Sequence, residues 1–291
     1  MKRNLFLLFI LVVIPSVNTL AQDVKCHYWF RAAHAMNWSD ELVDDYEGVQ
    51  RVTIKRYDVR DHFGEVVKYG DPYVAVFDFD DKGHLVKNSS YLNGALAYVV
   101  VYKYDTEGRL VERGGYDENG YLDEKCIYGY DSAGRLLEKR WFDSEGAPGW
   151  RGRHLYEYDS AGNVAGVEHY DYDGVLYGTS RFAYDSEGKQ IENVGYEPDG
   201  SLSYKQTYKY DSEGFLIEEV CYNFDGSISE KMVYSYDSAG NMVEMVWNNR
   251  GVIETHRRKY DSRGNEVEIL AYKTEGLIPF CLMEFEIVYS H

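Results

Sequence analysis

The chain has 291 residues and a formal net charge of −18, because 49 aspartates and glutamates outnumber 31 lysines and arginines. A surface this acidic repels phosphate groups, whose binding depends on neutralisation by Lys and Arg. Nucleic acid and anionic membranes are therefore excluded as favoured partners. The 29 tyrosines and 27 glycines belong largely to the repeats described below.

Residues 1–21 have the pattern of a secretory signal peptide. Lys2 and Arg3 precede an apolar run from Leu5 to Ile14, and Thr19-Leu20-Ala21 offers a cleavage site. Cleavage would remove two of the 31 basic residues and no acidic one, which makes the mature charge −20. The apolar run is shorter than the ~20 residues that span a bilayer. We expect an exported protein (periplasmic, cell-surface or secreted) without a membrane span.

Residues 22–48 lie outside the repeats and are predicted to form a small N-terminal cap. Ser39 is placed as an N-cap before Asp40-Glu41-Leu42-Val43, a typical acidic helix start. The first unit of a repeat array exposes an unpaired edge, and such edges need covering. A separate small functional module in this segment is the alternative.

From residue 49 to residue 291 the sequence predicts an array of β-hairpins. The motif Y-x-Y-D-x-x-G-x-L, here called the YD motif, is plainest from Tyr208 to Leu216. A second series, in which an aromatic residue stands four positions before a glycine, alternates with it, so that each unit of about 26 residues holds two half-units. The YD motif recurs at Tyr104, Tyr130, Tyr158, Tyr184, Tyr210 and Tyr236, with frayed copies at Phe79 and Tyr260. The second series comprises Tyr116, Phe142, Tyr170, Tyr196, Tyr222, Trp247 and Tyr272.

Each half-unit is predicted to be one turn and one strand. Asp-x-x-Gly suits a short hairpin loop, because Asp accepts nearby backbone N–H groups and Gly adopts positive φ without strain. The intervening segments are rich in Tyr, Val, Leu and Ile and are short for helices. The runs Val49–Asp58 and Val66–Tyr73 should form a degenerate first hairpin, and Phe280–Tyr289 a terminal capping strand after Pro279, which suits a sheet edge.

Opposite charges suggest a register for these hairpins. If Tyr222 faces Ser227, then Glu218 faces Lys231. Facing unlike charges stabilise a sheet by ~0.2–1 kcal/mol each, and chance in a charged sequence is the alternative explanation. The same rule gives three more pairs: Glu112 with Lys125, Glu138 with Arg151, and Glu192 with Lys205.

The expected fold is all-β, an antiparallel meander of about eighteen strands in a long curved or spiralling single sheet. Open sheets seldom exceed ~10 strands without curling or flattening. By simple alternation, Leu216, Glu218, Val220 and Tyr222 share one face. The sequence leaves the curved and the spiralling forms both open.

The stretch Tyr128-Gly-Tyr130-Asp131-Ser-Ala-Gly134-Arg-Leu136 resembles the YD repeat, also called the RHS repeat, of bacterial exported proteins. The resemblance covers roughly residues 77–276. It implies a β-shell of coiled strands, which in large members often encloses a C-terminal toxin. No such domain follows the last repeat, so we expect a short member without toxin delivery. A looser likeness exists to the cell-wall-binding repeats of choline- and glucan-binding proteins, whose Gly-Trp step is missing.

The aromatic rows are the main candidate binding surface. The YD tyrosines should form a ladder along one rim, and cross-strand packing is sufficient reason for such a ladder. The alternative is a surface on which sugars or protein segments stack. The residues predicted for it are Trp141, Trp150, Trp247, Tyr170, Tyr196 and Tyr222.

Catalytic, cofactor and metal sites are not expected. Asp78–Gly83 is similar to a calcium loop but has Lys82 at a ligand position, and no H-E-x-x-H or G-x-S-x-G motif occurs. The four cysteines are expected to be mostly free, packed thiols, since Cys126 and Cys221 lie about seven strands apart in an open sheet. A strongly coiled sheet would bring such residues closer. A disulfide that uses Cys26 remains open.

These observations favour a non-enzymatic scaffold or protein-binding surface at the bacterial cell envelope. A glycan- or cell-wall-binding protein that uses its Tyr and Trp rows is the alternative. A hydrolase is the third hypothesis, and it would most plausibly act through the N-terminal segment. No feature of the sequence identifies the partner.

Overall fold

The computed structural model describes residues 48–273 and 277–289. The expected signal peptide and all but the last residue of the expected cap lie outside these residues. No helix long and apolar enough to cross a membrane occurs in the described ranges. The strands are β1 (Val49–His62), β2 (Glu65–Phe79), β3 (Leu85–Leu92), β4 (Ala95–Tyr104), β5 (Leu110–Asp117), β6 (Leu122–Tyr130), β7 (Leu136–Asp143), β8 (Pro148–Tyr158), β9 (Val164–Tyr170), β10 (Leu176–Tyr184), β11 (Gln190–Tyr196), β12 (Leu202–Tyr210), β13 (Leu216–Tyr222), β14 (Ile228–Tyr236), β15 (Met242–Asn249), β16 (Val252–Tyr260), β17 (Glu266–Lys273) and β18 (Ile278–Tyr289).

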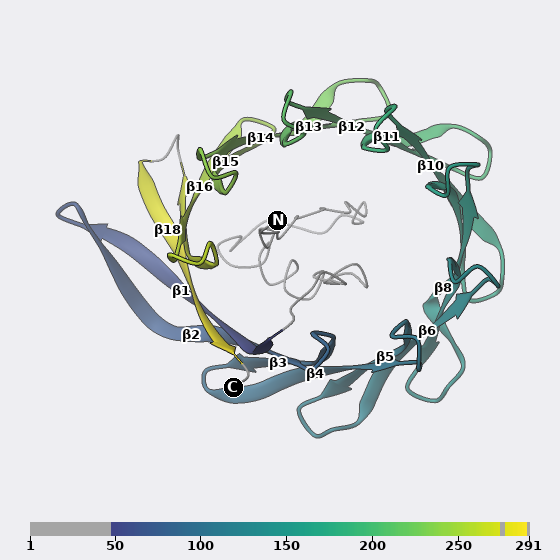
Figure 1. Ribbon diagram of the computed structural model, residues 1–291, viewed down its shortest axis with the longest axis horizontal. Helices are drawn as coiled ribbons and strands as arrows, with labels where there is room; N and C mark the ends of the chain where they lie inside the picture. The colour runs from purple at the N-terminus through teal and green to yellow at the C-terminus, as the bar shows by residue number, and fades with distance from the viewer. Residues whose placement is uncertain (1–47, 274–276, 290–291) are drawn as a thin grey trace.

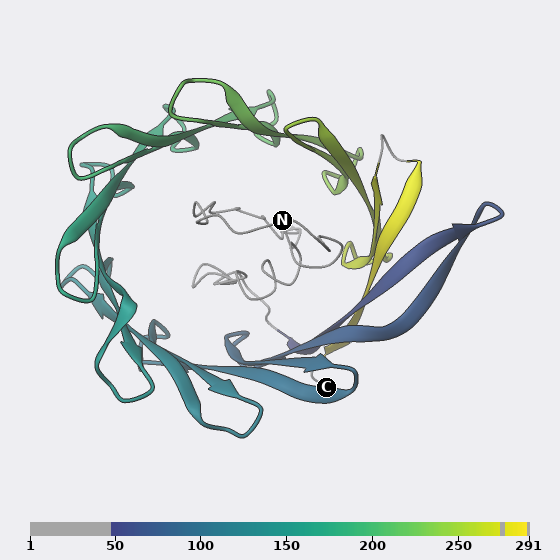
Figure 2. The same cartoon turned by 180° about the vertical axis from the view of Figure 1, so that it is seen from behind.

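The strands form one closed antiparallel barrel (Figures 1 and 2). Every strand pairs with its neighbours in sequence, and β1 pairs with both β2 and β18. Along the β1–β18 seam, Val52 lies opposite Ile287 and Tyr57 opposite Leu282. The expected open sheet, curved or spiralling, is therefore wrong. Closure gives both terminal strands a partner for the N–H and C=O groups that an open edge would leave unpaired.

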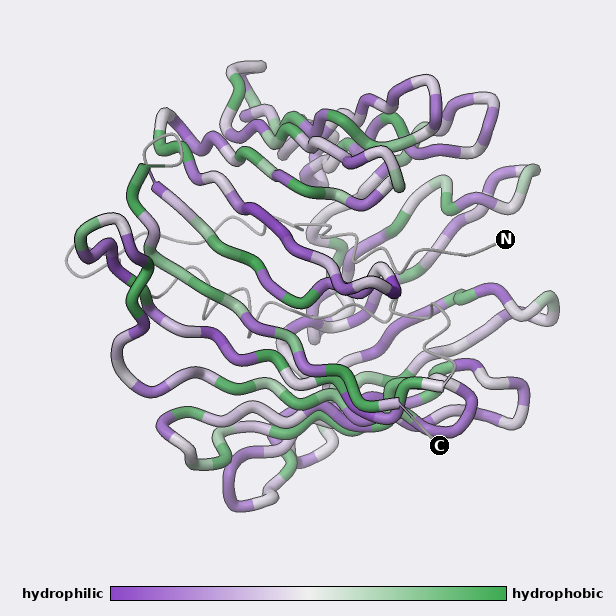
Figure 3. The backbone as a smooth tube through the Cα atoms, turned by 60° about the vertical axis from the view of Figure 1, so that its left-hand side comes forward, coloured by the Kyte–Doolittle hydropathy of each residue, from purple (hydrophilic) through white to green (hydrophobic). Residues whose placement is uncertain are grey.

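The two ends of the barrel carry different turns. The eight YD turns lie at one end, here called the YD end, and curl into the ring, whereas turns at the other end, here called the splayed end, point away from it (Figure 1). Hydrophilic and hydrophobic segments both occur along the strands between these ends (Figure 3). The YD turns follow Phe79, Tyr104, Tyr130, Tyr158, Tyr184, Tyr210, Tyr236 and Tyr260.

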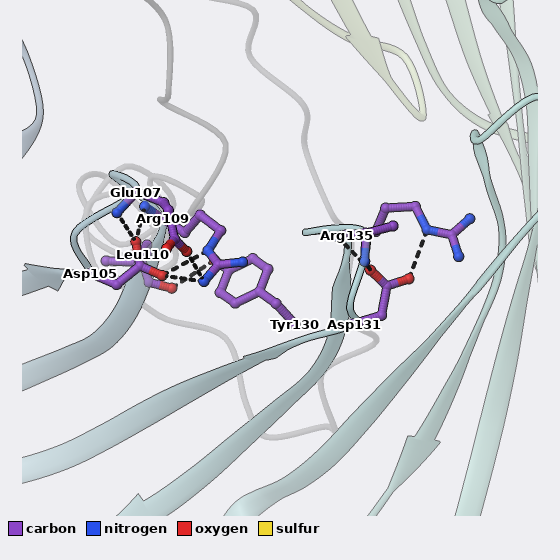
Figure 4. Close-up of polar contacts among 8 residues, drawn as sticks. Asp105, Glu107, Arg109, Leu110, Tyr130, Asp131 and Arg135 are labelled. Carbon is purple, nitrogen blue, oxygen red and sulfur yellow. Dashed lines mark hydrogen bonds and ion pairs between the residues drawn. The ribbon is translucent and has the colours of Figure 1, made fainter.

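Each YD turn is closed by its aspartate, as predicted. In the turn after β6, Asp131 Oδ1 accepts the backbone N–H groups of Ala133 and Arg135, both at 2.9 Å (Figure 4). The Gly134 N–H donates to the Asp131 carbonyl at 3.0 Å, and φ of Gly134 is +82°. This conformation strains any residue with a Cβ. The Asp and Gly of the motif are thus both required by the turn.

The YD tyrosines form the expected ladder along one rim, and hydroxyl groups connect its steps. Tyr130 Oη donates to the Leu110 carbonyl on the neighbouring strand at 2.7 Å, while the Arg109 guanidinium lies 5.0 Å from the Tyr130 ring centre (Figure 4). Each hairpin is thereby bonded to the preceding YD motif. The same hydroxyl-to-carbonyl bond is made by Tyr104, Tyr158, Tyr184, Tyr210, Tyr236 and Tyr260.

A β-bulge after each YD turn decides which residues face the inside. Tyr210 pairs with Leu216, but Lys209 pairs with Glu218, so Ile217 is the extra residue. The expected shared face is therefore wrong: Leu216 lies on the tyrosine side, and Glu218, Val220 and Tyr222 lie on the opposite side. The YD turns curl into the ring (Figure 1), and Arg109 of one such turn lies over the Tyr130 ring (Figure 4), so we name the tyrosine side the inner face and the other the outer face.

The register differs from the expected one by two residues. Tyr222 pairs with Ile228, so Lys231 lies opposite Val220 and not opposite Glu218. The Glu218–Lys231 ion pair still forms diagonally at 2.6 Å, and Lys205–Glu192 forms at 2.5 Å. Of the other two expected pairs, Glu112 faces Ile127, and Glu138 faces Leu155 and contacts Arg153 at 3.7 Å. The extra residue in the loop and the bulge beside it cause this difference.

The buried apolar residues lie mainly on the inner face. One cluster extends from β2 to β7 and contains Phe77, Tyr102 and Trp141; two smaller ones lie on β12–β15 and β17–β18. Cys126 and Cys281 are fully buried and Cys221 is half-buried, and no two of these three described cysteines form a disulfide. Pro279 is the second residue of β18 and lies opposite Tyr272 beside a bulge, outside the stretch of β18 that pairs with β1.

We predict that Tyr130→Phe lowers the free energy of unfolding by about 1 kcal/mol, because it leaves the Leu110 carbonyl without its hydroxyl donor. Urea unfolding of the mature chain measures this difference. Tyr121→Phe, at an exposed turn, is the matched control and should change little. Equal stabilities of the two variants would show that the hydroxyl ladder does not stabilise the barrel.

Candidate functional site

A continuous row of side chains, joined by edge-to-face ring contacts and hydrogen bonds, crosses the inner face from β7 to β12. Its histidines occupy directly opposed positions on β8 and β9. Its apolar end belongs to the large inner cluster of β2–β7. We call it the inner row and define it by Trp141, His154, His169, Ser180, Asn193 and Tyr204.

The aromatic half of the row is closely spaced. The ring centres of Trp141 and His154 are 4.6 Å apart, and those of His154 and His169 are 4.4 Å apart at an interplanar angle of 84°. Tyr177 lies beside this pair at the splayed end, with its hydroxyl 3.4 Å from His154 Nε2 and its ring 5.9 Å from His169. Tyr177 is 47% exposed, so the histidine pair is next to solvent.

The polar half is a chain of hydrogen bonds. His169 Nε2 lies 2.9 Å from Ser180 Oγ, which lies 3.1 Å from Tyr204 Oη. Tyr204 Oη also donates to Asn193 Oδ1 at 3.3 Å. A Cβ on Gly195 would come within 2.1 Å of the Tyr204 ring. Only glycine at this position therefore leaves room for the ring against the backbone of β11. The row thus depends on one glycine of β11.

Both histidines of the row are held neutral. Burial, followed by the proximity of His169, Lys139 and Arg151, lowers the pKa of His154 to about 3. Burial also lowers the pKa of His169. Each imidazole therefore has one N–H donor and one nitrogen lone pair at neutral pH.

A buried carboxyl group lies on the inner face beyond the row. Glu219 on β13 is 2% exposed. Its carboxyl group accepts a hydrogen bond from the Gln206 side-chain amide and another, at 3.0 Å, from the Tyr234 hydroxyl. Gln206 faces Asn193 across the β11–β12 pairing, which joins this group to the inner row. Burial raises the pKa of Glu219 to about 7, because its effect outweighs that of the two hydrogen bonds, which lower the pKa. Its protonation state therefore changes near neutral pH.

The splayed end carries an exposed apolar surface that the sequence analysis did not identify. Phe63 is 94% exposed, Phe224 78% and Trp150 70%. The YD end has polar turns by comparison, so this exposure belongs to one end of the barrel. We call the surface the apolar rim and define it by Phe63, Val66, Tyr69, Leu92, Leu96, Tyr121, Trp150, Tyr172, Val175, Tyr177, Phe224, Ile228, Val252, Leu277 and Ile278.

The structure separates the aromatic residues predicted to form one stacking surface. Trp141 and Trp247 lie on the inner face, on β7 and β15, eight strands apart. Trp141 is buried, and Trp247 Nε1 donates to Glu230 at 3.2 Å. Trp150 is exposed at the splayed end.

The three predicted tyrosines lie on the outer face. Tyr170, Tyr196 and Tyr222 end β9, β11 and β13, near the splayed end and two strands apart. Tyr170 donates to Glu168 at 2.8 Å, and the Arg153 guanidinium lies 4.8 Å from its ring centre. The six predicted residues therefore occupy four separate places: two on the inner face, one at the splayed end and one on the outer face.

Sequence reasoning missed the inner row because its members are far apart in the chain. His154 and His169 belong to no motif, and they meet only through the β8–β9 register. The apolar rim had a visible signal: Tyr121, Tyr172 and Phe224 stand in turns, where polar residues are usual.

Glu219→Gln should remove a pH dependence of stability. The pKa of Glu219 is about 7 in the folded chain and ordinarily 4.5. The stability that its protonated form contributes is therefore complete below pH 4.5 and lost as the pH rises through 7. The wild-type free energy of unfolding, relative to that of the variant, should fall by about 3 kcal/mol between pH 4.5 and 7.5. Urea unfolding at both pH values measures it.

Glu187→Gln, in an exposed YD turn, is the control. Its free energy of unfolding should change between the two pH values as that of the wild type does. If the wild type and Glu219→Gln differ in free energy of unfolding by the same amount at both pH values, the raised pKa of Glu219 is contradicted.

No protein-family model and no curated protein matches the chain. Among solved structures, the chain is similar to a porin-like protein from Bacteroides uniformis, with a TM-score of 0.45 and 11% identity over 82% of this chain and 98% of that one. It is also similar to TcdB2-TccC3 without its hypervariable C-terminal region, with a TM-score of 0.32 and 13% identity over 78% of this chain and 19% of that one. A third similarity is to a DUF1329 family protein from Desulfovibrio piger, with a TM-score of 0.23 and 10% identity over 89% and 92% of the two chains. These are distant structural similarities, and they assign no family to the chain.

Proposed function

We propose that this chain is an exported, non-catalytic scaffold that binds another protein through its apolar rim. The observation that carries the proposal is the distribution of exposed large apolar side chains. Most of those among the described residues lie at the splayed end, from Phe63 on the first hairpin to Ile278 on the last strand. Large exposed apolar surfaces typically mark interaction sites.

The charge of the rim specifies what kind of partner fits. The turns that present Tyr121 and Tyr172 also contain Asp117, Asp171 and Asp173. An acidic border around aromatic anchors complements a basic surface with apolar pockets, and it increases the association rate of such a partner. We therefore infer a protein partner with a basic, partly apolar contact surface.

The outer wall supports an aqueous setting for this scaffold. Ion pairs lie on it between neighbouring strands, such as Lys103–Glu112 at 2.6 Å and Lys259–Glu268 at 2.7 Å. Charges on a lipid-facing wall cost ~2–4 kcal/mol each near the bilayer centre. In water, by contrast, such pairs favour solubility and a defined register.

Glycan binding is the second candidate, and the spacing of the outer tyrosines favours it. Tyr170, Tyr196 and Tyr222 recur at every second strand, which corresponds to ~10 Å at ~4.8 Å per strand. A row of rings at a constant interval suits a repeating polymer. The Arg153 contact with Tyr170 limits access to one of these rings, so the protein partner is the favoured interpretation.

The test is site-specific photocrosslinking. The mature chain, residues 22–291, carries a benzophenone amino acid at Phe63, Tyr121 or Phe224, and is exposed to envelope and culture-supernatant proteins of its source. The control carries it at Glu187, in a turn of the YD end. We expect one protein to crosslink at all three rim positions and not at Glu187, and Trp150→Ser to reduce its yield several-fold.

Equal crosslinking at Glu187 and at the rim, or none at the rim, would refute the protein partner. A glycan array tests the second candidate separately. If the array shows saccharide-dependent binding, Tyr196→Ala abolishes it, and no protein crosslinks at the rim, then glycan binding by the outer tyrosines is the supported function.

A further inference from the structure

We propose that His154 and His169 bind one divalent transition-metal ion of the Cu²⁺, Ni²⁺ and Zn²⁺ class, with the Tyr177 hydroxyl as a third ligand. This site does not rest on the proposed function of the apolar rim, because it requires the histidine pair and not a protein partner; Tyr177 belongs to both. It uses side chains that three strands bring together just inside the splayed end.

The geometry of the pair suits one shared ion. His154 and His169 face each other across β8 and β9, with ring centres 4.4 Å apart. A metal–nitrogen bond is about 2.1 Å long, which places the ion roughly 3 Å from each imidazole centre. Two such rings whose centres are 4–5 Å apart can therefore occupy neighbouring coordination positions of one ion, with little movement of the strands.

The surroundings orient the rings and give access. Ser180 Oγ, 2.9 Å from His169 Nε2, holds that imidazole as outer-shell hydrogen bonds hold metal ligands and leaves its second nitrogen for the ion. Tyr177 Oη lies 3.4 Å from His154 Nε2. Tyr177 is about half exposed, so an ion can enter from water and retain water ligands.

Two features set the expected affinity below that of a structural zinc site. In the described part of the chain, no group of three His, Cys, Asp or Glu side chains could hold a metal, so the nitrogen ligands are two. Lys139 lies opposite His154, and Arg151 also places positive charge near it. Imidazole ligands bind Cu²⁺ most tightly in this series, so Cu²⁺ is the best probe.

The test titrates CuCl₂ into the mature chain, residues 22–291, after chelator treatment. Isothermal calorimetry gives stoichiometry and affinity, and electron paramagnetic resonance reports nitrogen ligands. We expect His154→Asn and His169→Asn each to weaken one Cu²⁺ site at least tenfold. His62→Asn, at the end of β1, and His84→Asn, in the turn between β2 and β3, are the controls and should leave it unchanged. Lys139→Gln removes a positive charge near His154, leaves both histidines in place, and should tighten binding several-fold.

The proposal is overturned if His154→Asn, His169→Asn and Lys139→Gln all bind Cu²⁺ as the wild type does. If the asparagine variants do not fold, histidine modification of the wild type by diethylpyrocarbonate replaces them. Protection of His154 and His169 by Cu²⁺ would then support the site, and modification of both at an unchanged rate would overturn it.

Discussion

The pairing of β1 with β18 is the constraint on which the rest of this structure depends. Without it, the meander would be a long single sheet with two unpaired edges and no defined inside. With it, each strand has two partners, and the alternation of side chains becomes a distinction between an inner and an outer face. The seam uses ordinary strand pairs, such as Val52 with Ile287, and no special residue marks it.

The β-bulges beside the YD turns assign residues to the two faces. One extra residue at Ile217 places Glu219 inside and Glu218 outside, which gives the two adjacent carboxyl groups different chemistry. The outer one lies between Lys209 and Lys231 and its pKa is lowered by both. The inner one is buried and its pKa is raised to about 7. The same device is repeated around the ring: exposed ion pairs such as Lys103–Glu112 lie on the outer face, whereas the inner face carries aromatic side chains and buried ion pairs such as Arg258–Glu266.

Position along the barrel axis divides the molecule a second time. At the YD end, short turns closed by aspartate curl inward and each tyrosine is bonded to the preceding hairpin. At the splayed end, apolar residues such as Phe63 and Phe224 extend into solvent. The two ends therefore have separate tasks in our proposal: one holds neighbouring hairpins together, and the other binds the partner. The histidine pair lies near the second end, where Tyr177 connects the inner face with the rim.

The sequence by itself determined the hairpin repeat, the Asp-Gly turns and the tyrosine ladder, because each depends on residues within one or two neighbouring units. Asp131 specifies its turn through backbone hydrogen bonds, and Gly134 does so through its positive φ. Both residues belong to the repeated motif, so the turn can be predicted from the sequence. Only the tertiary structure decided closure, since the pairing of residue 52 with residue 287 depends on the summed twist of all the strands between them. It also decided the inner row and the separation of the predicted tryptophans, because one bulge exchanges the faces of every residue that follows it in a strand. His154 and His169 stand in no distinctive sequence pattern, and their juxtaposition results from register alone.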